Sequence, residues 1–402
     1  MGRFDLYRYD EKLEKTLKAL KDDGKLIEDN RKNIISFSRI RLAKGSSAGR
    51  VAKVVYCLRN LSKMLNKPFK DATKEDLIGL IGTLDATKYS DYTKYDYKIV
   101  LKMFYKWLLG DDETAPAVIK WFRPRLKNEK HKLPEELITE DEVLKLAETA
   151  DHPRDKALIM VLYESGCRIG ELLSLKMKHI SVDQYGAVLM VDGKTGCRRV
   201  RIISSSSLLS AWINNYPNSG DPEAPLWPPR SSNHLYKKEP VEHASIYRVL
   251  GKLSKKAGIK KKIYPHLFRH SRATALAGKL TEAQMKEHFG WTKDSDMAGT
   301  YVHLSGRDVD NALLQLHGMT NGESKKEEKM KVRPCMRCRE NNSPVSKYCT
   351  RCGTPMDEAL LSRIDDERKN SDNLMNTLMK DKEFKEFMMK KIFDMRLNNQ
   401  IS

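Results

Sequence analysis

The stretch AVLMVDGKTGCRRVRIIS, residues 187–204, interrupts a sequence that is otherwise helical in pattern. Apolar and β-branched residues lie on both sides of the polar segment DGKTG, which is typical of a β-hairpin with its turn at Lys194. We therefore predict a mainly α protein with a small β-hairpin or sheet, in the helix-dominated α+β class.

Helical spacing is found on both sides of this hairpin. In VAKVVYCLRNLSKML (51–65) and YKIVLKMFYKWLLG (97–110), apolar residues recur every three or four positions. Nearer the hairpin, Thr139 and Glu142 form a capping-box pattern that begins a helix. The apolar run ALIMVLYESG (157–166) predicts a buried helix that ends at its glycine.

These patterns divide the chain into six segments, with charged or polar stretches between the periodic ones. The predicted segments are a helical domain (1–122), a linker (123–134), a second domain (135–320), a flexible linker (321–332), a cysteine-rich module (333–355) and a C-terminal helix (356–402).

The charge of the chain is strongly positive and unevenly distributed. Its 402 residues carry a formal net charge of +20, and residues 31–70 alone have an excess of 11 basic residues. Such clustering favours a polyanionic partner, most often nucleic acid. There is no apolar run of the ~20 residues that span a bilayer and no signal-peptide core at the N-terminus. We expect a cytoplasmic protein with no membrane partner.

Four of the seven cysteines form two Cys-x-x-Cys pairs, CMRC and CTRC, separated by ten residues. Two such pairs predict a tetrahedral thiolate site, for which structural zinc is the commoner metal and iron the less common one. The polar residues between the pairs offer almost no core, so metal would supply most of the folding energy of this zinc ribbon. The predicted ligands are Cys335, Cys338, Cys349 and Cys352. The remaining Cys57, Cys167 and Cys197 are interpreted as structural or incidental.

The segment ESGCRIGELLSL (164–175) places Arg168 at a predicted helix N-terminus, where backbone N–H groups also point. Glu171, one turn further on, could orient its guanidinium, although an ordinary surface ion pair would have the same spacing. Lys194, at the hairpin turn, could reach a DNA groove or protonate a leaving oxygen. A lysine that is merely solvated at a turn would give the same sequence pattern.

The segment PHLFRHSRAT (265–274) places His266, Arg269 and His270 on one face of a predicted helix. Arginine can hold two phosphate oxygens in a fork, and imidazole can donate a hydrogen bond or move a proton, so the face suits a phosphate. His270 is interpreted as a packing or orienting residue. Further on, Trp291 and Tyr301 could be core residues, although tyrosine can also be a nucleophile.

The order of these motifs resembles that of the tyrosine recombinase (phage integrase) family. The shared pattern is R-x-x-E, a hairpin lysine, H-x-x-R-H, G followed by His or Trp, and a tyrosine, over about residues 30–315. The segment FGWTKDSDMAGTYVHLSGRDVD (289–310) is most similar to archaeal integrases, several of which also carry a cysteine-rich tail. The resemblance implies a helical N-terminal DNA-clamping domain followed by a catalytic domain.

The resemblance implies that Arg168 and Arg269 bind the scissile phosphate, and that His266 acts as an acid or base and a phosphate donor. Trp291 stands where the family has His or Trp. It retains an N–H donor but has no titratable group. The interval from Trp291 to Tyr301 is one position longer than in many bacterial members.

By the same resemblance, Tyr301 attacks the phosphorus and Lys194 protonates the departing 5′ oxygen. The implied function is site-specific recombination of duplex DNA through a 3′-phosphotyrosyl intermediate, with no ATP or catalytic metal and with a tetramer in the synapse. Integration of a mobile element is the favoured role, ahead of resolution of replicon dimers. Two alternatives remain: relaxation of the type IB topoisomerase kind, and a zinc-ribbon DNA-binding regulator without catalysis.

The C-terminal segment carries an apolar stripe at helical spacing. We expect it to dock on the second domain or on another protomer, with the ribbon as a spacer or as a DNA contact through Arg333, Arg337 and Arg339. The stripe comprises Leu374, Met375, Leu378, Met379, Phe384, Phe387, Met388, Ile392 and Phe393.

Overall fold

The computed structural model describes residues 6–110, 114–126, 136–193, 196–229, 239–302, 313–314, 316–317, 319 and 329–397. The chain separates into two compact units, Met1–Leu133 and Pro134–Ser402. In the described ranges, every helix is too short or too polar to cross a membrane.

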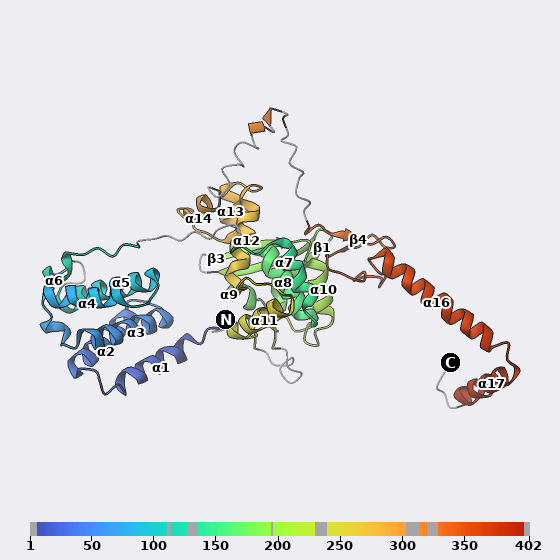
Figure 1. The fold of residues 1–402 in the computed structure, drawn as a ribbon, viewed down its shortest axis with the longest axis horizontal. Helices are drawn as coiled ribbons and strands as arrows, with labels where there is room; N and C mark the ends of the chain where they lie inside the picture. The colour runs from blue at the N-terminus through green and yellow to red at the C-terminus, as the bar shows by residue number, and fades with distance from the viewer. Residues whose placement is uncertain are drawn as a thin grey trace. The chain divides into compact units, whose positions relative to one another are not determined.

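The first unit is built from helices (Figure 1). Its core contains an aromatic cluster in which the ring of Phe104 lies 5.4 Å from that of Phe37 and 4.9 Å from that of Phe69, between centroids. The predicted apolar face of 51–65 is buried in this core, as the helical spacing requires. The elements are α1 (Tyr9–Lys21), α2 (Glu28–Ala43), α3 (Ala48–Leu65), η1 (Phe69–Asp71), α4 (Lys74–Ala86), α5 (Asp91–Leu109) and α6 (Ala117–Lys120).

Part of the basic character of this unit is balanced internally. Arg59 and Lys63, on successive turns of α3, both pair with the buried carboxylate of Asp23, at 2.6 and 2.7 Å. These contacts, led by the hydrogen bond from Lys63, lower the pKa of Asp23 to about 2. The two cations therefore have a structural role that net charge alone does not reveal.

The second unit surrounds α8 with other elements. Helix α8 is buried on nearly every side and contacts α7, α10, α12 and β3. Before the tail, the elements of the unit are α7 (Glu140–Thr149), α8 (Pro153–Ser165), α9 (Ile169–Leu173), η3 (Met177–His179), β1 (Ile180–Asp183), β2 (Gly186–Gly193), β3 (Gly196–Ile202), α10 (Ser206–Asn214), α11 (His243–Lys256), α12 (Pro265–Ala277), α13 (Glu282–Phe289) and α14 (Met297–Val302).

Two local signals place the ends of the first helices of this unit. The capping box of Thr139 and Glu142 forms as predicted and begins α7. Gly166 ends α8 in the left-handed conformation, with φ of 56°, and a Cβ there would collide with the ring of Phe289. The break lets the chain turn and begin α9 with Arg168 as its N-cap residue.

The predicted hairpin is confirmed, within a three-stranded antiparallel sheet of order β1-β2-β3. Its register pairs Val188 with Arg201 and Asp192 with Cys197. The first strand, β1, was not predicted from the sequence. Lys194, between β2 and β3, lies outside the described residues.

A buried carboxylate joins the end of α8 to the start of α10. Glu164 accepts hydrogen bonds from the backbone N–H groups of Ile203, Ser204 and Ser205 and from the Ser205 hydroxyl, at 2.6–3.0 Å. A helix N-terminus favours negative charge, so this carboxylate is well solvated by protein. The contact fixes the serine-rich corner beside the end of α8.

The tail contains a two-stranded sheet, β4 (Arg333–Pro334) and β5 (Asn341–Asn342), and the helices α16 (Glu358–Leu378) and α17 (Lys382–Leu397). The prediction of one C-terminal helix is therefore corrected to two. The interruption lies at Asp381, whose carboxylate accepts a hydrogen bond from the Phe384 N–H at 2.8 Å and so begins a new helix. Leu374, Phe387 and Phe393, from the predicted apolar stripe, are more than half exposed.

Candidate active site

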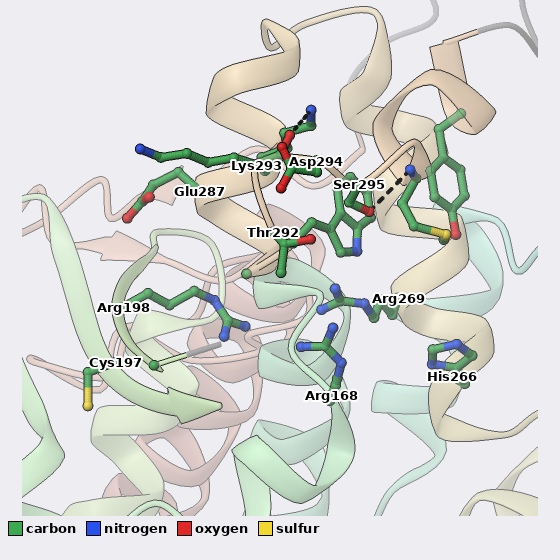
Figure 2. A pocket seen from close by; sticks show the side chains of 16 residues that line it. Arg168, Cys197, Arg198, His266, Arg269, Glu287, Thr292, Lys293, Asp294 and Ser295 are labelled. Atoms are coloured by element: carbon green, nitrogen blue, oxygen red, sulfur yellow. Dashed lines mark hydrogen bonds between the residues drawn. The ribbon is translucent and has the colours of Figure 1, made fainter. Parts of the chain in front are cut away.

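A cavity of about 950 Å³ lies where the start of α9, strand β3, helix α12 and the α13–α14 segment meet. Figure 2 shows the guanidinium groups of Arg168, Arg198 and Arg269 pointing toward one another in it, with His266 nearby. Trp291 and Tyr301 also line this cavity. The convergence of the three guanidinium groups makes the cavity strongly attractive to an anion.

Arg168 is held by its own helix turn. Its Nη1 donates to Glu171 Oε1 at 2.7 Å, and its backbone N–H donates to Glu171 Oε2 at 3.0 Å. The carboxylate is buried, whereas the side chain of Arg168 remains 38% exposed. Glu171 therefore orients Arg168 and leaves part of its guanidinium accessible to a ligand.

Arg198 is a third arginine of this site, and sequence reasoning missed it. The side chain is 5% exposed; its Nη2 donates to Glu171 Oε2 at 2.7 Å and its Nε donates to the His288 carbonyl at 3.0 Å. Two glycines leave room for it: a Cβ on Gly193 or on Gly290 would lie 3.2 or 2.7 Å from its Nη1. Arg198 thus links the hairpin to α9 and to the end of α13.

Arg269 is almost fully buried and is held by backbone carbonyls. Its Nη1 donates to the carbonyl of Gly166 at 3.0 Å and its Nη2 to that of Phe289 at 2.7 Å. Its Cζ also lies 5.1 Å from the ring centroid of Phe289 and 5.6 Å from that of Trp291. These neutral partners fix the side chain and leave its positive charge uncancelled.

The ionisation of these groups follows from their surroundings. Burial, then the nearby charge of Arg168, lowers the pKa of Arg269 to about 10, so it remains cationic at neutral pH. Burial opposes the ionisation of Glu171, but contacts with Arg198 and Arg168 outweigh it and lower the pKa of that carboxyl. One carboxylate therefore faces three arginines, which leaves net positive charge for an anion to neutralise.

Tyr301 lies in a small apolar cluster between α12, α13 and α14. Its ring stacks on the indole of Trp291, with centroids 5.7 Å apart and planes 4° apart. Ala273, Met285, Phe289 and Ala298 complete the cluster, and Tyr301 is only 6% exposed. Burial raises the pKa of its phenol, and the charge of Arg269 acts in the opposite direction.

Two histidines, one helical turn apart on α12, belong to this site, and one of them contacts the tyrosine. Nδ1 of His270 is hydrogen-bonded to the Tyr301 hydroxyl. The ring of His266 meets that of His270 edge to face, with centroids 4.5 Å apart, and it lines the cavity. The phenol, the imidazoles and the arginines therefore form one continuous site.

The comparisons with known proteins agree with this geometry. Residues 136–307 match the phage integrase family. Tyrosine recombinase XerA of Pyrococcus furiosus is 31% identical over 265 residues, which cover 65% of this chain and 86% of XerA. The chain belongs to the tyrosine recombinase family. Tyrosine recombinase XerC of Staphylococcus epidermidis is 25% identical over 228 residues, which cover 54% of this recombinase and 72% of XerC.

Solved structures share the fold at lower identity. A lambda integrase dimer bound to a COC' core site has a TM-score of 0.54 and 17% identity, covering 69% of this recombinase and 77% of that chain. The XerH recombinase bound to its difH substrate before cleavage has a TM-score of 0.51 and 18% identity, covering 77% of this recombinase and 94% of XerH. At this identity the likeness establishes the fold.

The structure brings five of the six predicted site residues of the recombinase into one cavity. They are Arg168, His266, Arg269, Trp291 and Tyr301. The sixth, Lys194, lies outside the described residues, although its neighbours Gly193 and Gly196 are paired across the hairpin. The signal for Arg198 was strand alternation: counting back in twos from the buried Ile202 and Val200 places it on the inner face.

The four tail cysteines of the recombinase also come together. Their sulfur atoms lie within 4.8 Å of one another, with Cys335–Cys352 at 3.6 Å and Cys338–Cys349 at 3.5 Å. A tetrahedral site with metal–sulfur bonds of ~2.3 Å requires sulfur separations of about 3.8 Å. The cluster therefore fits a metal ion held by four thiolates.

Polar groups support this cluster. The backbone N–H of Arg337 donates to Cys335 Sγ at 3.4 Å, and Asn342 Nδ2 lies 3.6 Å from Cys349 Sγ as a donor. The next residue, Ser343, is fully buried, and its N–H donates to Ser207 Oγ of α10 at 2.8 Å. A contact at the start of α10 therefore anchors the cysteine module to the rest of its unit.

Proposed function

We propose that this recombinase cuts and rejoins duplex DNA at specific sites, with Tyr301 as the nucleophile. The observation that carries the proposal is the shared cavity in which Tyr301 lies beside the fixed guanidinium of Arg269 and the partly exposed one of Arg168. A phosphodiester placed there would have its non-bridging oxygens near two cations and its phosphorus near a phenol.

The cations would act most strongly on the transition state. Attack by Tyr301 places extra negative charge on the phosphoryl oxygens, and Arg168 and Arg269 are held in position before DNA arrives. His266 and the indole N–H of Trp291 would serve as further donors. Because both arginines are already oriented, little reorganisation is needed as the charge develops.

The chemistry conserves the energy of the phosphodiester bond. Tyr301 would form a 3′-phosphotyrosyl bond, and the 5′ oxygen would leave with a proton from Lys194. Reversal of this step by a second 5′ hydroxyl joins new strands without ATP. Integration of a mobile element is the favoured use of this reaction, ahead of resolution of replicon dimers.

We assign parts of this function to separate segments of the chain. Residues 1–122 would clamp DNA through their basic helices, residues 135–320 would carry out the chemistry, and the segments 123–134 and 321–332 would be linkers. Four protomers would assemble on paired sites. Lambda integrase, which shares this fold, has been solved as a tetramer bound to a Holliday junction. Duplex DNA and further copies of this chain are therefore the proposed partners.

In the cysteine module we propose structural zinc, held by Cys335, Cys338, Cys349 and Cys352. The support is the separation of their sulfur atoms and the N–H groups directed at them. Iron also accepts four thiolates and is the less common choice. Zinc would crosslink residues 333–355, whose apolar core is small.

The experiment does not require the sequence of the recombination site to be known, because only covalent attachment of DNA to the protein is scored. The full chain is incubated with a pool of random-sequence duplexes that carry single nicks, and protein-linked DNA is recovered after denaturation. The wild type should retain DNA, Tyr301→Phe should retain none, and the control Tyr185→Phe, at an exposed turn, should behave as wild type. Adducts that survive in Tyr301→Phe would refute the assignment.

The same DNA distinguishes the topoisomerase alternative. Recovered sequences are placed in two supercoiled plasmids, and products are examined for joining of the two circles. A site-specific recombinase exchanges strands between the circles, whereas a topoisomerase only relaxes each of them.

A further inference from the structure

The reacting oxygen of Tyr301 contacts a histidine to which the resemblance assigns no catalytic role. Nδ1 of His270 is hydrogen-bonded to this phenol oxygen, although the two residues are 31 positions apart in the chain. His266, one turn earlier on α12, lines the cavity instead. The two histidines therefore face different parts of the same site.

We propose that His270 is a catalytic residue that accepts the proton of Tyr301 as the phenol attacks DNA. The inference rests on the proposed function, in which Tyr301 is the nucleophile. It replaces the interpretation of His270 as a packing or orienting residue with a chemical role.

The reaction needs such an acceptor because a phenol attacks poorly while it holds its proton. The ordinary pKa of tyrosine is ~10, and burial raises that of Tyr301 further, against the influence of Arg269. A neutral imidazole, with an ordinary pKa of ~6.5, is the side chain best suited to take a proton near neutral pH.

Two other described groups near the phenol, those of Trp291 and Arg269, cannot take this proton. Trp291 stacks on the ring of Tyr301, but its indole N–H is only a donor. Arg269 is a permanent cation near neutral pH, and its terminal nitrogens already donate to two carbonyls. His270 is the neighbour with both the contact and a lone pair.

In the proposed step, each bond that forms is matched by a bond that breaks. Neutral His270 carries its proton on Nε2 and presents the Nδ1 lone pair to Tyr301. The O–H bond of Tyr301 breaks, its proton moves to Nδ1, and the phenol oxygen forms a bond to phosphorus. The bond from phosphorus to the 5′ oxygen breaks, and Lys194 supplies the proton to that oxygen. In the rejoining step, His270 returns its proton to the departing phenolate.

This assignment gives the two histidines different tasks. His266, at the cavity, would donate to a phosphate oxygen, while His270 would serve the nucleophile. Their rings are in edge-to-face contact, with centroids 4.5 Å apart. A phosphate bound beside His266 would also favour positive charge on His270 during attack.

The test uses full-length protein and a nicked duplex recovered by covalent capture, under single-turnover conditions with saturating DNA. Removal of a general base costs about 10²–10⁴-fold in rate. We therefore expect His270→Ala to form adduct at least ~10²-fold more slowly than wild type while binding DNA equally well. Added imidazole should restore part of the rate, because the truncated side chain leaves space beside the phenol.

A second substrate distinguishes loss of the general base, His270, from loss of the general acid, Lys194. When sulfur replaces the bridging 5′ oxygen, the leaving group departs without a proton. This substrate should rescue Lys194→Ala but leave His270→Ala slow. His270→Gln, which keeps a hydrogen-bond acceptor but cannot take the proton, should also be slow, and it provides a test if the alanine variant folds poorly.

Several outcomes would overturn the proposal. Adduct formation by His270→Ala or His270→Gln at the wild-type rate or faster would mean that His270 takes no proton or merely restrains the phenol. Full rescue of His270→Ala by the sulfur substrate would place His270 at the leaving group. In either case wild-type adducts would still depend on Tyr301, so the proposed function would stand; absence of adduct from the wild type would reject the proposed function itself.

Discussion

The active-site cavity and the cysteine module both organise polar side chains, but they do so with different partners. In the cavity, Arg269 is held by two backbone carbonyls, and Glu171 is shared by Arg168 and Arg198. In the module, the four sulfur atoms lie within 4.8 Å of one another, and Val345 is the one hydrophobic residue of 333–355, apart from cysteines, that is buried.

This difference indicates that the two regions are held in their folded conformation by different interactions. The cavity is supported by packed helices around α8, so its cations are positioned before any ligand arrives. The module lacks comparable apolar burial, and its thiolates would repel one another without a cation between them. We therefore expect the cavity to remain folded without metal and the module to depend on it.

The largest expected effect comes from removing metal ligands. The double change Cys335→Ser and Cys349→Ser should abolish metal binding and expose the amides of residues 333–355, because zinc contributes about 10–16 kcal/mol in zinc-finger peptides. Metal analysis and hydrogen exchange measure the two effects, with Cys197→Ser as the control at an exposed cysteine. Continued protection of the module in the double variant would show that it folds without metal.

A smaller effect is expected in the cavity when Arg198 is removed. Arg198→Ala removes one of the two arginines that pair with the buried Glu171, and breaking a buried ion pair costs about 3–5 kcal/mol. Arg199→Ala is the matched control, because that side chain is exposed on the other face of β3, where changes cost under about 0.5 kcal/mol. Equal stability of the two variants in denaturant unfolding would show that the Glu171 bridge contributes little.

The smallest effect is expected at the contact between the module and α10. Ser207→Ala removes the acceptor for the buried Ser343 N–H, a change that costs about 1–3 kcal/mol. Exchange of that amide should quicken while the amides of α12 stay protected, and Ser210→Ala, one turn along α10, is the control. Unchanged exchange at Ser343 would mean that other contacts anchor the module.

Much of this architecture is predictable because it depends on local signals. Gly166 ends a helix through its left-handed conformation, and the box of Thr139 and Glu142 caps one. The hairpin follows from apolar residues around a polar turn, and the four cysteines follow from their spacing. Each of these signals lies within a few residues of the structure that it determines.

Other features depend on contacts that local patterns do not contain. The hydrogen bond between His270 and Tyr301 requires α12 and α14 to pack together. Arg198 lies in a run of basic residues that resembles an exposed surface, although alternation with Val200 places it inside. The second tail helix was missed because the apolar stripe continues past Asp381, which nevertheless caps a new helix.

The residue that becomes linked to DNA identifies the nucleophile directly. Adducts of the full chain are trimmed with nuclease, digested with trypsin and sequenced by mass spectrometry. The peptide of residues 294–307, DSDMAGTYVHLSGR, contains a single tyrosine. We expect a nucleotide on Tyr301 in this peptide, linked through a 3′ phosphate. A nucleotide on any other residue, or linkage through a 5′ phosphate, would show that Tyr301 is not the nucleophile proposed here.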